Sequence, residues 1–182
     1  MKIKNKKCVI CAKEFRPYKS LQRVCDIKCS IIYANIKIKE KVLKKARKQK
    51  RVGLDAMMTH SQCKKKLQTI FNKFIRIRDQ DRGCVSCGTT LEGKKFDAGH
   101  FYPTTYQGIR FDERNVHGQC VHCNRDKHGN IHEYRKRITD RITEEDLIWL
   151  DDHRHVCVKM TIPELKELII IYKEKVKNYD KE

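Results

Sequence analysis

The chain has 182 residues and a formal net charge of +19, and only 39% of its residues are hydrophobic. This length suits one ordinary domain or two small ones, and the modest apolar content predicts a small core whose stability is supplemented by metal. No run of about 18 apolar residues occurs and the first residues lack the apolar stretch of a secretion signal, so we expect neither a membrane-spanning helix nor secretion.

The number of cysteines indicates a reducing compartment, and the positive charge indicates a polyanionic partner. Ten cysteines without a secretion signal indicate metal ligation in a reducing cytoplasm rather than disulfides. Residues 1–57 carry 18 basic and 4 acidic side chains, a net of +14, and residues 58–182 carry the other 24 and 19, a net of +5. A polyanionic partner is expected, because each neutralised phosphate releases counterions and adds affinity. The alternatives are a basic protein without a nucleic-acid role, and membrane-surface binding, which is disfavoured because the most basic stretch lacks a matching face of large apolar residues.

Residues 1–30 contain a first complete set of metal ligands, spaced Cys8-x2-Cys11-x13-Cys25-x3-Cys29. Two cysteine pairs can place four thiolates around one Zn²⁺. We therefore predict a zinc finger in which a knuckle at Cys8–Cys11 is followed by a pair at the start of a helix. Unrelated buried thiols are the alternative.

Residues 31–57 predict a basic helical linker. The stretch from Ile36 to Arg51 holds nine basic residues against the single acid Glu40, and Gly53 is expected to end the helix at a flexible joint. A helix this cationic is suited to lie along a phosphate backbone, although a merely solvated linker helix is a serious alternative. The candidate phosphate contacts are Lys37, Lys41, Lys44, Lys45, Arg47, Lys48 and Arg51.

Residues 58–182 are expected to form a second domain built around helices. Thr59-x-x-Gln62 predicts a capping box, followed by a buried helical stripe that includes Leu67, Phe71 and Phe74. Residues 131–142 show helical spacing, Thr143-x-x-Asp146 starts another short helix, and residues 161–164 begin the last one. The stripe of that last helix is expected to pack on the helix over residues 59–81.

A second ligand set, Cys84-x2-Cys87 and Cys120-x2-Cys123, defines a zinc module over residues 84–130. Helix signals are weak here until Cys120. We predict a zinc knuckle, a strand that ends at His100, a second strand near residues 115–119 and a short helix from Val121.

The side chains inside this module suit phosphodiester hydrolysis. Such a reaction needs a base that takes a proton from water and a divalent cation that neutralises charge on the phosphate and the leaving oxygen. His100 is the candidate base, while the oxygens of Asp97 and Asn124 are of the type that Mg²⁺ accepts. Asn115 is expected to bond the loop near His100 and orient the imidazole, and Lys127 to contact a phosphate.

The residues of the module form the pattern Cys84-x2-Cys87, Asp97-x2-His100, Asn115-x4-Cys120-x2-Cys123-Asn124-x2-Lys127. This pattern resembles the HNH nucleases, which have the ββα-metal fold. More narrowly, nearly the whole chain resembles the NinG (Rap) recombination proteins of lambdoid phages. That resemblance rests on the basic four-cysteine N-terminus and on Phe74-Ile75-Arg76-x-Arg78-Asp79, Cys87-Gly88-Thr89, Asp97-Ala98-Gly99-His100, Arg110-Phe111-x-Glu113-Arg114-Asn115 and Cys120-Val121-x-Cys123-Asn124.

The resemblance implies an α+β fold with an N-terminal zinc finger, a basic helix and an HNH module embedded in helices. It implies a structure-specific endonuclease that acts on branched recombination intermediates such as D-loops and Holliday junctions. The implied cofactors are two structural Zn²⁺ ions and a catalytic Mg²⁺ or Mn²⁺. Branched DNA, contacted also by Arg110, is the implied partner, and a second copy of the chain and recombination proteins of the phage or its host are further candidates.

One position departs from the HNH pattern. HNH enzymes usually carry an acidic or histidine metal ligand directly before the base, where this chain has Gly99. Asp97 lies on the same side of an ideal strand as residue 99, so it is the candidate replacement. A non-catalytic zinc-finger protein that binds DNA or RNA, and a junction-binding scaffold with a lost active site, are the competing interpretations. His117, His122 and His128 are expected at the surface or in contact with phosphates, and only His128, four residues beyond Asn124, is placed to be a metal ligand. Cys63 and Cys157 are expected as small buried residues.

Overall fold

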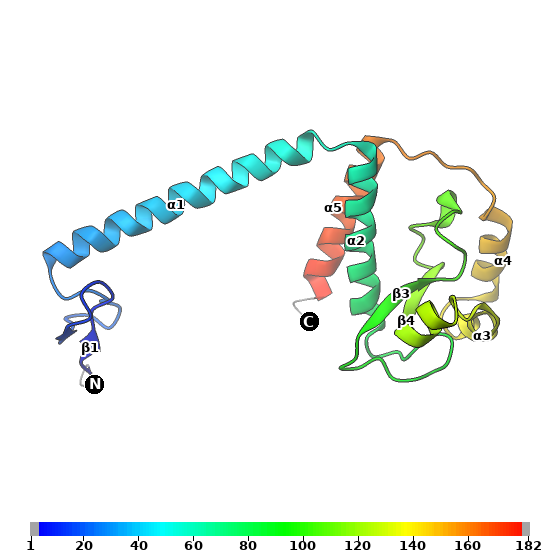
Figure 1. Ribbon diagram of the computed structural model, residues 1–182, viewed down its shortest axis with the longest axis horizontal. Helices are drawn as coiled ribbons and strands as arrows, with labels where there is room; N and C mark the ends of the chain where they lie inside the picture. The colour runs from blue at the N-terminus through cyan, green and yellow to red at the C-terminus, as the bar shows by residue number, and fades with distance from the viewer. Residues whose placement is uncertain (1–3, 180–182) are drawn as a thin grey trace. The chain divides into compact units, whose positions relative to one another are not determined.

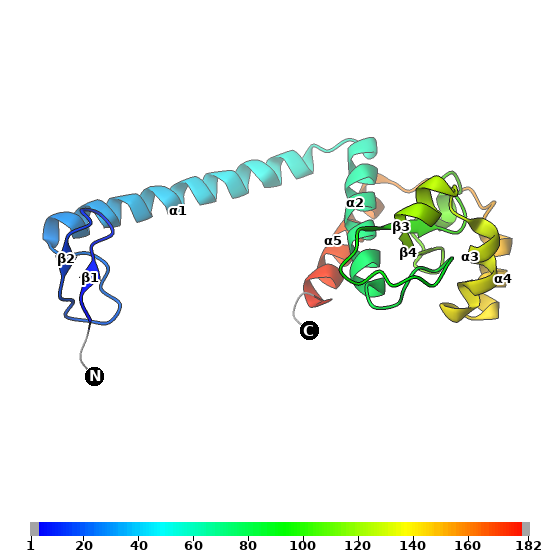
Figure 2. The ribbon, with the colours of Figure 1, turned by 60° about the horizontal axis from the view of Figure 1, so that its bottom comes forward.

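The computed structural model describes residues 4–179, and the chain divides after Met58 into two compact units (Figures 1 and 2). The first unit contains a small hairpin and one long helix. The second contains a two-stranded sheet with helices on both sides. None of the helices in the described range is long and apolar enough to cross a membrane.

In the first unit, β1 (Lys6–Lys7) pairs antiparallel with β2 (Glu14–Phe15), and α1 (Ile27–Ala56) follows. Asp26 caps α1, because its carboxylate accepts a hydrogen bond of 2.7 Å from the Cys29 amide. The prediction that Gly53 ends this helix is wrong, since α1 continues to Ala56. A glycine inside a helix costs only about 1 kcal/mol, which the neighbouring helix-forming residues offset.

The surface of α1 exposes several large apolar residues as well as its basic ones. Six of them lie on the half of the helix opposite Lys37, Lys44 and Lys48, by the helical spacing of 100° per residue. These exposed side chains are Ile31, Ile32, Ile36, Ile38, Val42 and Leu43. The basic side chains are not segregated from them, because Lys28, Lys39 and Lys50 fall on the same half by the same spacing, so α1 has no separate apolar face.

The second unit is built on two long helices, α2 (His60–Asp79) and α5 (Ile162–Tyr179), which pack side by side (Figure 1). Leu67 and Phe71 of α2 are fully buried, and the ring of Phe71 meets that of Tyr172 edge to face at a centroid distance of 4.9 Å. The predicted packing of the last helix on the helix after Thr59 is confirmed. So is the capping box, in which the Thr59 hydroxyl and the Gln62 side chain each bond the other's backbone amide.

The sheet consists of β3 (Phe96–His100) and β4 (Val116–Cys120), antiparallel, with His100 opposite Val116 and Asp97 opposite Gln119. It lies between α2 with α5 on one side and α3 with α4 on the other (Figures 1 and 2). The remaining helical elements are η1 (Gln107–Ile109), the π-helical turn η2 (His122–Asp126), α3 (Ile131–Arg137), η3 (Ile138–Asp140) and α4 (Glu144–His153). The predicted strand ending at His100 and the short helix after Cys120 are both confirmed.

Alternation along the strands gives the sheet two different faces. A side chain built at Gly118 would meet Asp79 at the end of α2, so Gly118 and its pair Ala98 face α2, as do His100 and Val116. The other face carries Asp97, Gly99, His117 and Gln119 and is directed toward η2 and α3. Candidate side chains on β3 and β4 can therefore contact one another only if they lie on the same face of the sheet.

Candidate functional site

The four cysteines of the module come together as predicted. The sulfurs of Cys84, Cys87, Cys120 and Cys123 all lie within 4.8 Å of one another, so the cluster can hold a zinc ion. Gly88, with a φ of 74°, turns the knuckle after Cys87, and its amide bonds the Cys84 carbonyl at 2.8 Å. Burial opposes ionisation of Cys87, but hydrogen bonds from Thr89 outweigh it and lower the pKa of this thiol to about 6. A thiolate is the form that zinc binds.

The N-terminal cysteines form a second cluster of the same kind. The sulfurs of Cys8, Cys11, Cys25 and Cys29 also all lie within 4.8 Å of one another, with Cys25 just before the N-cap of α1 and Cys29 in its first turn. Backbone hydrogen bonds, chiefly from Cys11, lower the pKa of Cys8 to about 6. Both four-cysteine predictions are confirmed as clusters that can hold metal.

His100 lies at the end of β3, half-buried and oriented by the backbone. Its Nε2 lies 3.1 Å from the carbonyl oxygen of Arg110, and because a carbonyl can only accept, Nε2 carries the proton. In the neutral ring Nδ1 is then the basic nitrogen. Burial lowers the pKa of His100, and the bond to the Arg110 carbonyl only partly opposes this effect. The imidazole is therefore neutral near pH 7 and able to accept a proton.

Asn115 has the loop-bonding role that was predicted for it. Its side chain is fully buried, its oxygen accepts from the Tyr102 amide at 2.8 Å, and its Nδ2 donates to the carbonyls of Tyr102 and Ile109 at 3.1 Å each. These three bonds fix the start and the end of the loop between His100 and Arg110. Asn115 thereby holds the backbone just before Arg110, whose carbonyl orients His100, without contacting the imidazole itself.

The two predicted ligands of the divalent cation are neighbours. The Asn124 amide nitrogen lies 3.0 Å from a carboxylate oxygen of Asp97. Arg125 also holds that carboxylate through two bonds, at 2.7 Å and 2.8 Å, and together with Asn124 it lowers the pKa of Asp97. Oxygen donors of this kind suit a Mg²⁺ ion that keeps several waters, but the Arg125 guanidinium would have to leave Asp97 for a cation to bind there.

The site residues thus form two groups rather than one. Asp97 and Asn124 meet on the sheet face directed toward η2, whereas His100 projects from the α2 face of the same strand. Apart from the two cysteine clusters, residues 4–179 contain no group of three metal-ligating His, Cys, Asp or Glu side chains. A divalent cation would therefore depend on Asp97, Asn124, water and the substrate phosphate.

Gln119 is a site residue that sequence reasoning missed. It lies opposite Asp97, is fully buried, and donates from Nε2 to the Ser86 hydroxyl at 2.7 Å and to the Gly129 carbonyl at 2.6 Å. A Cβ built on Gly99 would lie 2.2 Å from Oε1 of Gln119, and that oxygen has no hydrogen-bond partner among the described residues. The Gln119 amide thus occupies the space that a side chain at residue 99 would need, which explains the glycine.

This fit predicts a coupled pair. Gly99→Ala should destabilise the second unit by about 1–3 kcal/mol, because its methyl group overlaps a clamped side chain. Gln119→Ala should cost about 1–3 kcal/mol through the bonds it leaves unmade. The double variant should be more stable than the sum of the two losses by about 1 kcal/mol, as measured by urea unfolding in a double-mutant cycle. Strict additivity would show that the two side chains do not compete for space.

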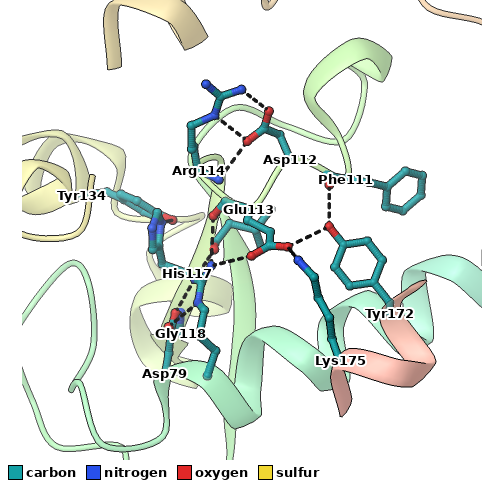
Figure 3. A network of polar contacts seen from close by, with 12 residues as sticks. Asp79, Phe111, Asp112, Glu113, Arg114, His117, Gly118, Tyr134, Tyr172 and Lys175 are labelled. Atoms are coloured by element: carbon teal, nitrogen blue, oxygen red, sulfur yellow. Dashed lines mark hydrogen bonds and ion pairs between the residues drawn. The ribbon is translucent and has the colours of Figure 1, made fainter. Parts of the chain in front are cut away.

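A buried ionic network lies beneath the sheet (Figure 3). Asp79, fully buried, accepts from the Gly118 amide at 2.7 Å and from two nitrogens of Arg78, at 2.7 Å and 2.8 Å. The expectation that His117 lies at the surface is wrong, because its Nδ1 meets the Tyr134 hydroxyl at 3.1 Å, and that hydroxyl bonds the Gly99 carbonyl. Burial, and next the charge of Arg78, lowers the pKa of His117 to about 3, so it stays neutral.

The remaining candidates differ in how they are placed. Lys127 is exposed directly after η2, three residues beyond Asn124. Arg110 instead uses its guanidinium within the fold, bonding the Gln68 side chain at 2.8 Å and the Thr104 carbonyl at 3.3 Å. Cys63 is buried as expected, whereas Cys157 is exposed, so that expectation is wrong for Cys157.

Comparison with known proteins decides the family. The family described as "Bacteriophage Lambda NinG protein" matches residues 1–182. The chain belongs to the NinG family. It is 41% identical to "Protein ninG" of Escherichia phage lambda over 126 residues, covering 68% of this chain and 60% of that protein. It is 40% identical to "Protein ninG" of Escherichia phage 933W over 126 residues, covering 68% of this chain and 61% of that protein. The NinG chain thus spans about three fifths of these relatives in the matched region, and no solved structure matches it.

Proposed function

We propose that this NinG-family chain is a metal-dependent endonuclease of the HNH type that cuts branched DNA intermediates of phage recombination. The observation that carries the proposal is the state of His100, a neutral imidazole whose Nε2 is bound by the Arg110 carbonyl, which leaves Nδ1 basic. This histidine ends the first strand of a pair that is joined to a four-cysteine cluster and followed by a helical turn bearing Asn124. The order of strand, strand and helix is that of a ββα-metal module.

In this proposal Nδ1 of His100 takes a proton from the water that attacks the phosphorus. Asp97 and Asn124 would hold a Mg²⁺ or Mn²⁺ ion, which when bound neutralises charge on the phosphate and on the leaving 3′ oxygen. Arg125, once released from Asp97, and Lys127 would contact the same strand through its phosphates. Because His100 and Asp97 lie on opposite faces of β3, the arrangement described does not bring the base and the cation ligands to one phosphodiester, so hydrolysis requires one of these groups to move.

The pair formed by Asp97 and Arg125 favours a second candidate function. A carboxylate that is already neutralised by a guanidinium through two bonds is a poor starting point for a cation site, and phosphate binding by the exposed arginine needs no catalysis. A non-catalytic protein that binds branched DNA would use the zinc clusters and the basic residues but not His100.

His100→Ala separates the two functions. The endonuclease proposal predicts that nicking of a four-way junction with Mg²⁺ falls by roughly 10²–10⁴-fold, while junction binding without added divalent ion is unchanged. The matched control is His132→Ala, since His132 lies exposed on α3 and should not affect either measurement. Because the pKa of His100 is lowered, the wild-type rate should rise with pH through a value below 6.5 and then level off. Equal nicking by variant and wild type, or no nicking with Mg²⁺ or Mn²⁺, would eliminate the proposed enzyme.

A further inference from the structure

Three arginines gather around a hollow beside the module's cysteine cluster. The hollow has a volume of about 410 Å³ and is lined by Arg82, Cys84, Val85, Arg137, Asp140 and Arg141. A second hollow of about 580 Å³ adjoins it, because Arg82, Asp140 and Arg141 line both. The three guanidinium groups come from separate segments, namely the connection after α2, the end of α3 and the residue after η3.

The fold fixes this cluster in place. Arg141 donates from Nη2 to the Gly83 carbonyl at 2.9 Å and also bonds the Arg82 carbonyl, so it ties the end of η3 to the segment that carries Arg82. The Arg137 guanidinium lies on the zinc knuckle, where a Cβ at Gly88 would be 2.8 Å from its Nη2. Gly88 therefore makes room for Arg137 as well as turning the chain.

The positive charge in this hollow is poorly balanced by acids. Within residues 4–179, no ion pair joins Arg82 or Arg141 to an acidic side chain, and Arg137 reaches Asp140 only at 4.0 Å. The two other arginines of the adjoining hollow differ, since Arg78 is paired with Asp79 and Arg114 with Asp112 and Asp146. Burial lowers the pKa of Arg141, Asp79 and more weakly Asp140 raise it, and the charges of Arg82 and Arg78 lower it, so these two guanidinium groups repel that of Arg141. An anion placed among them would relieve that repulsion.

The chemistry of the lining selects the kind of anion. The planar guanidinium group of arginine can donate two parallel hydrogen bonds to the oxygens of a phosphate. The lining of the hollow contains no aromatic ring on which a base could stack. The hollow therefore suits a backbone phosphate rather than a nucleotide held by its base. We propose that Arg82, Arg137 and Arg141 form a phosphodiester-binding site for a DNA strand, separate from α1 and from the group around Asp97.

One alternative use of these charges has to be distinguished. A zinc ion bound by four thiolates carries a formal charge of −2, and Arg137 lies on that cluster, so the arginines could instead balance the metal centre. The two roles predict different losses. A phosphate site predicts weaker DNA binding with zinc retained, whereas charge balance predicts loss of zinc.

The test uses the full chain with zinc bound and a synthetic four-way junction, without added divalent ion, so that its outcome is independent of cleavage. Arg82→Gln with Arg137→Gln removes two exposed charges and leaves the Arg141 bonds to the backbone intact. We expect the dissociation constant to rise roughly tenfold or more at fixed salt, and the slope of log K against log salt to fall by about two. Zinc content should equal that of the wild type.

Two controls make the result decisive. Lys173→Gln with Lys177→Gln removes the same charge from the exposed side of α5 and should change the slope by less than one. Arg82→Lys with Arg137→Lys keeps the charge and should retain most of the wild-type slope, because a lysine still contacts a phosphate. The proposal is overturned if the Gln variant binds the junction like the α5 control, or if its loss of affinity is accompanied by loss of zinc.

Discussion

Cys123→Ser is expected to unfold the module over residues 84–130 and to abolish every activity of the second unit. The apolar cluster beneath the knuckle consists of Cys84, Leu91 and Cys123, with Phe96 and Cys120 packed against it, so three of its five members are the metal ligands themselves. We expect that such a core does not form without a metal ion. Structural zinc sites in small domains contribute on the order of 10 kcal/mol to folding, and losing one of four thiolates removes a large part of that.

Zinc content by elemental analysis and thermal unfolding by circular dichroism measure this effect. The wild type should bind two zinc ions per chain and the Cys123→Ser variant one, with an additional unfolding step at lower temperature. Cys157→Ser is the matched control, because Cys157 is exposed and outside both clusters, and it should leave zinc content and stability unchanged. A Cys123→Ser protein that kept two zinc ions and the wild-type melting temperature would show that the cluster is not a metal site.

Local sequence signals predicted the parts of this fold that depend on neighbouring residues. Thr59 and Thr143 form the expected caps, because a hydroxyl three residues before a Gln or Asp satisfies free amides within one helical turn. The cysteine pairs were predictable for the same reason, since two residues between thiols suit one metal ion.

Long-range contacts decided the parts that could not be predicted. The sequence does not reveal that Gln119 fills the space above Gly99, because the two residues lie on different strands and meet only through the sheet register. The bonds from Arg125 to Asp97 and the burial of His117 against Tyr134 likewise depend on how η2 and α3 pack on the sheet. Strand alternation could have located Gln119. Once the pairing of β3 with β4 is known, alternation places the Gln119 side chain on the same face of the sheet as that of Asp97.

The position of Asp97 relative to His100 also shows a limit of motif spacing. The pattern Asp97-x2-His100 fixes a separation of three residues, and in an extended strand an odd separation directs two side chains to opposite faces. Because β3 extends through His100, this spacing places the two groups on opposite faces, which the assignment of both to one site did not take into account.

Asp79→Ala is expected to destabilise the second unit by about 3–5 kcal/mol, because it leaves the Arg78 guanidinium without its buried partner. It also removes the acceptor of the Gly118 amide, a group at the centre of β4 that water does not reach. Asp79→Asn should cost less, since an amide oxygen can still accept from Gly118. The control is Asp152→Ala, an exposed acid at the end of α4, which should change the free energy of unfolding by less than about 0.5 kcal/mol.

The pH dependence of this effect provides a second measurement. Burial alone would raise the pKa of Asp79, but the bonds from Arg78 and Gly118 outweigh it, so the folded pKa lies below the unfolded value. The carboxylate therefore stabilises the fold fully above about pH 5, and that contribution is lost as the pH falls below the unfolded value of about 3.9 toward the folded one. The difference in unfolding free energy between the wild type and Asp79→Asn should accordingly be constant from pH 8 to about pH 5 and shrink at lower pH. A difference that grew on acidification would mean that the buried carboxyl is protonated in the native state, and that Arg78 is held by other partners.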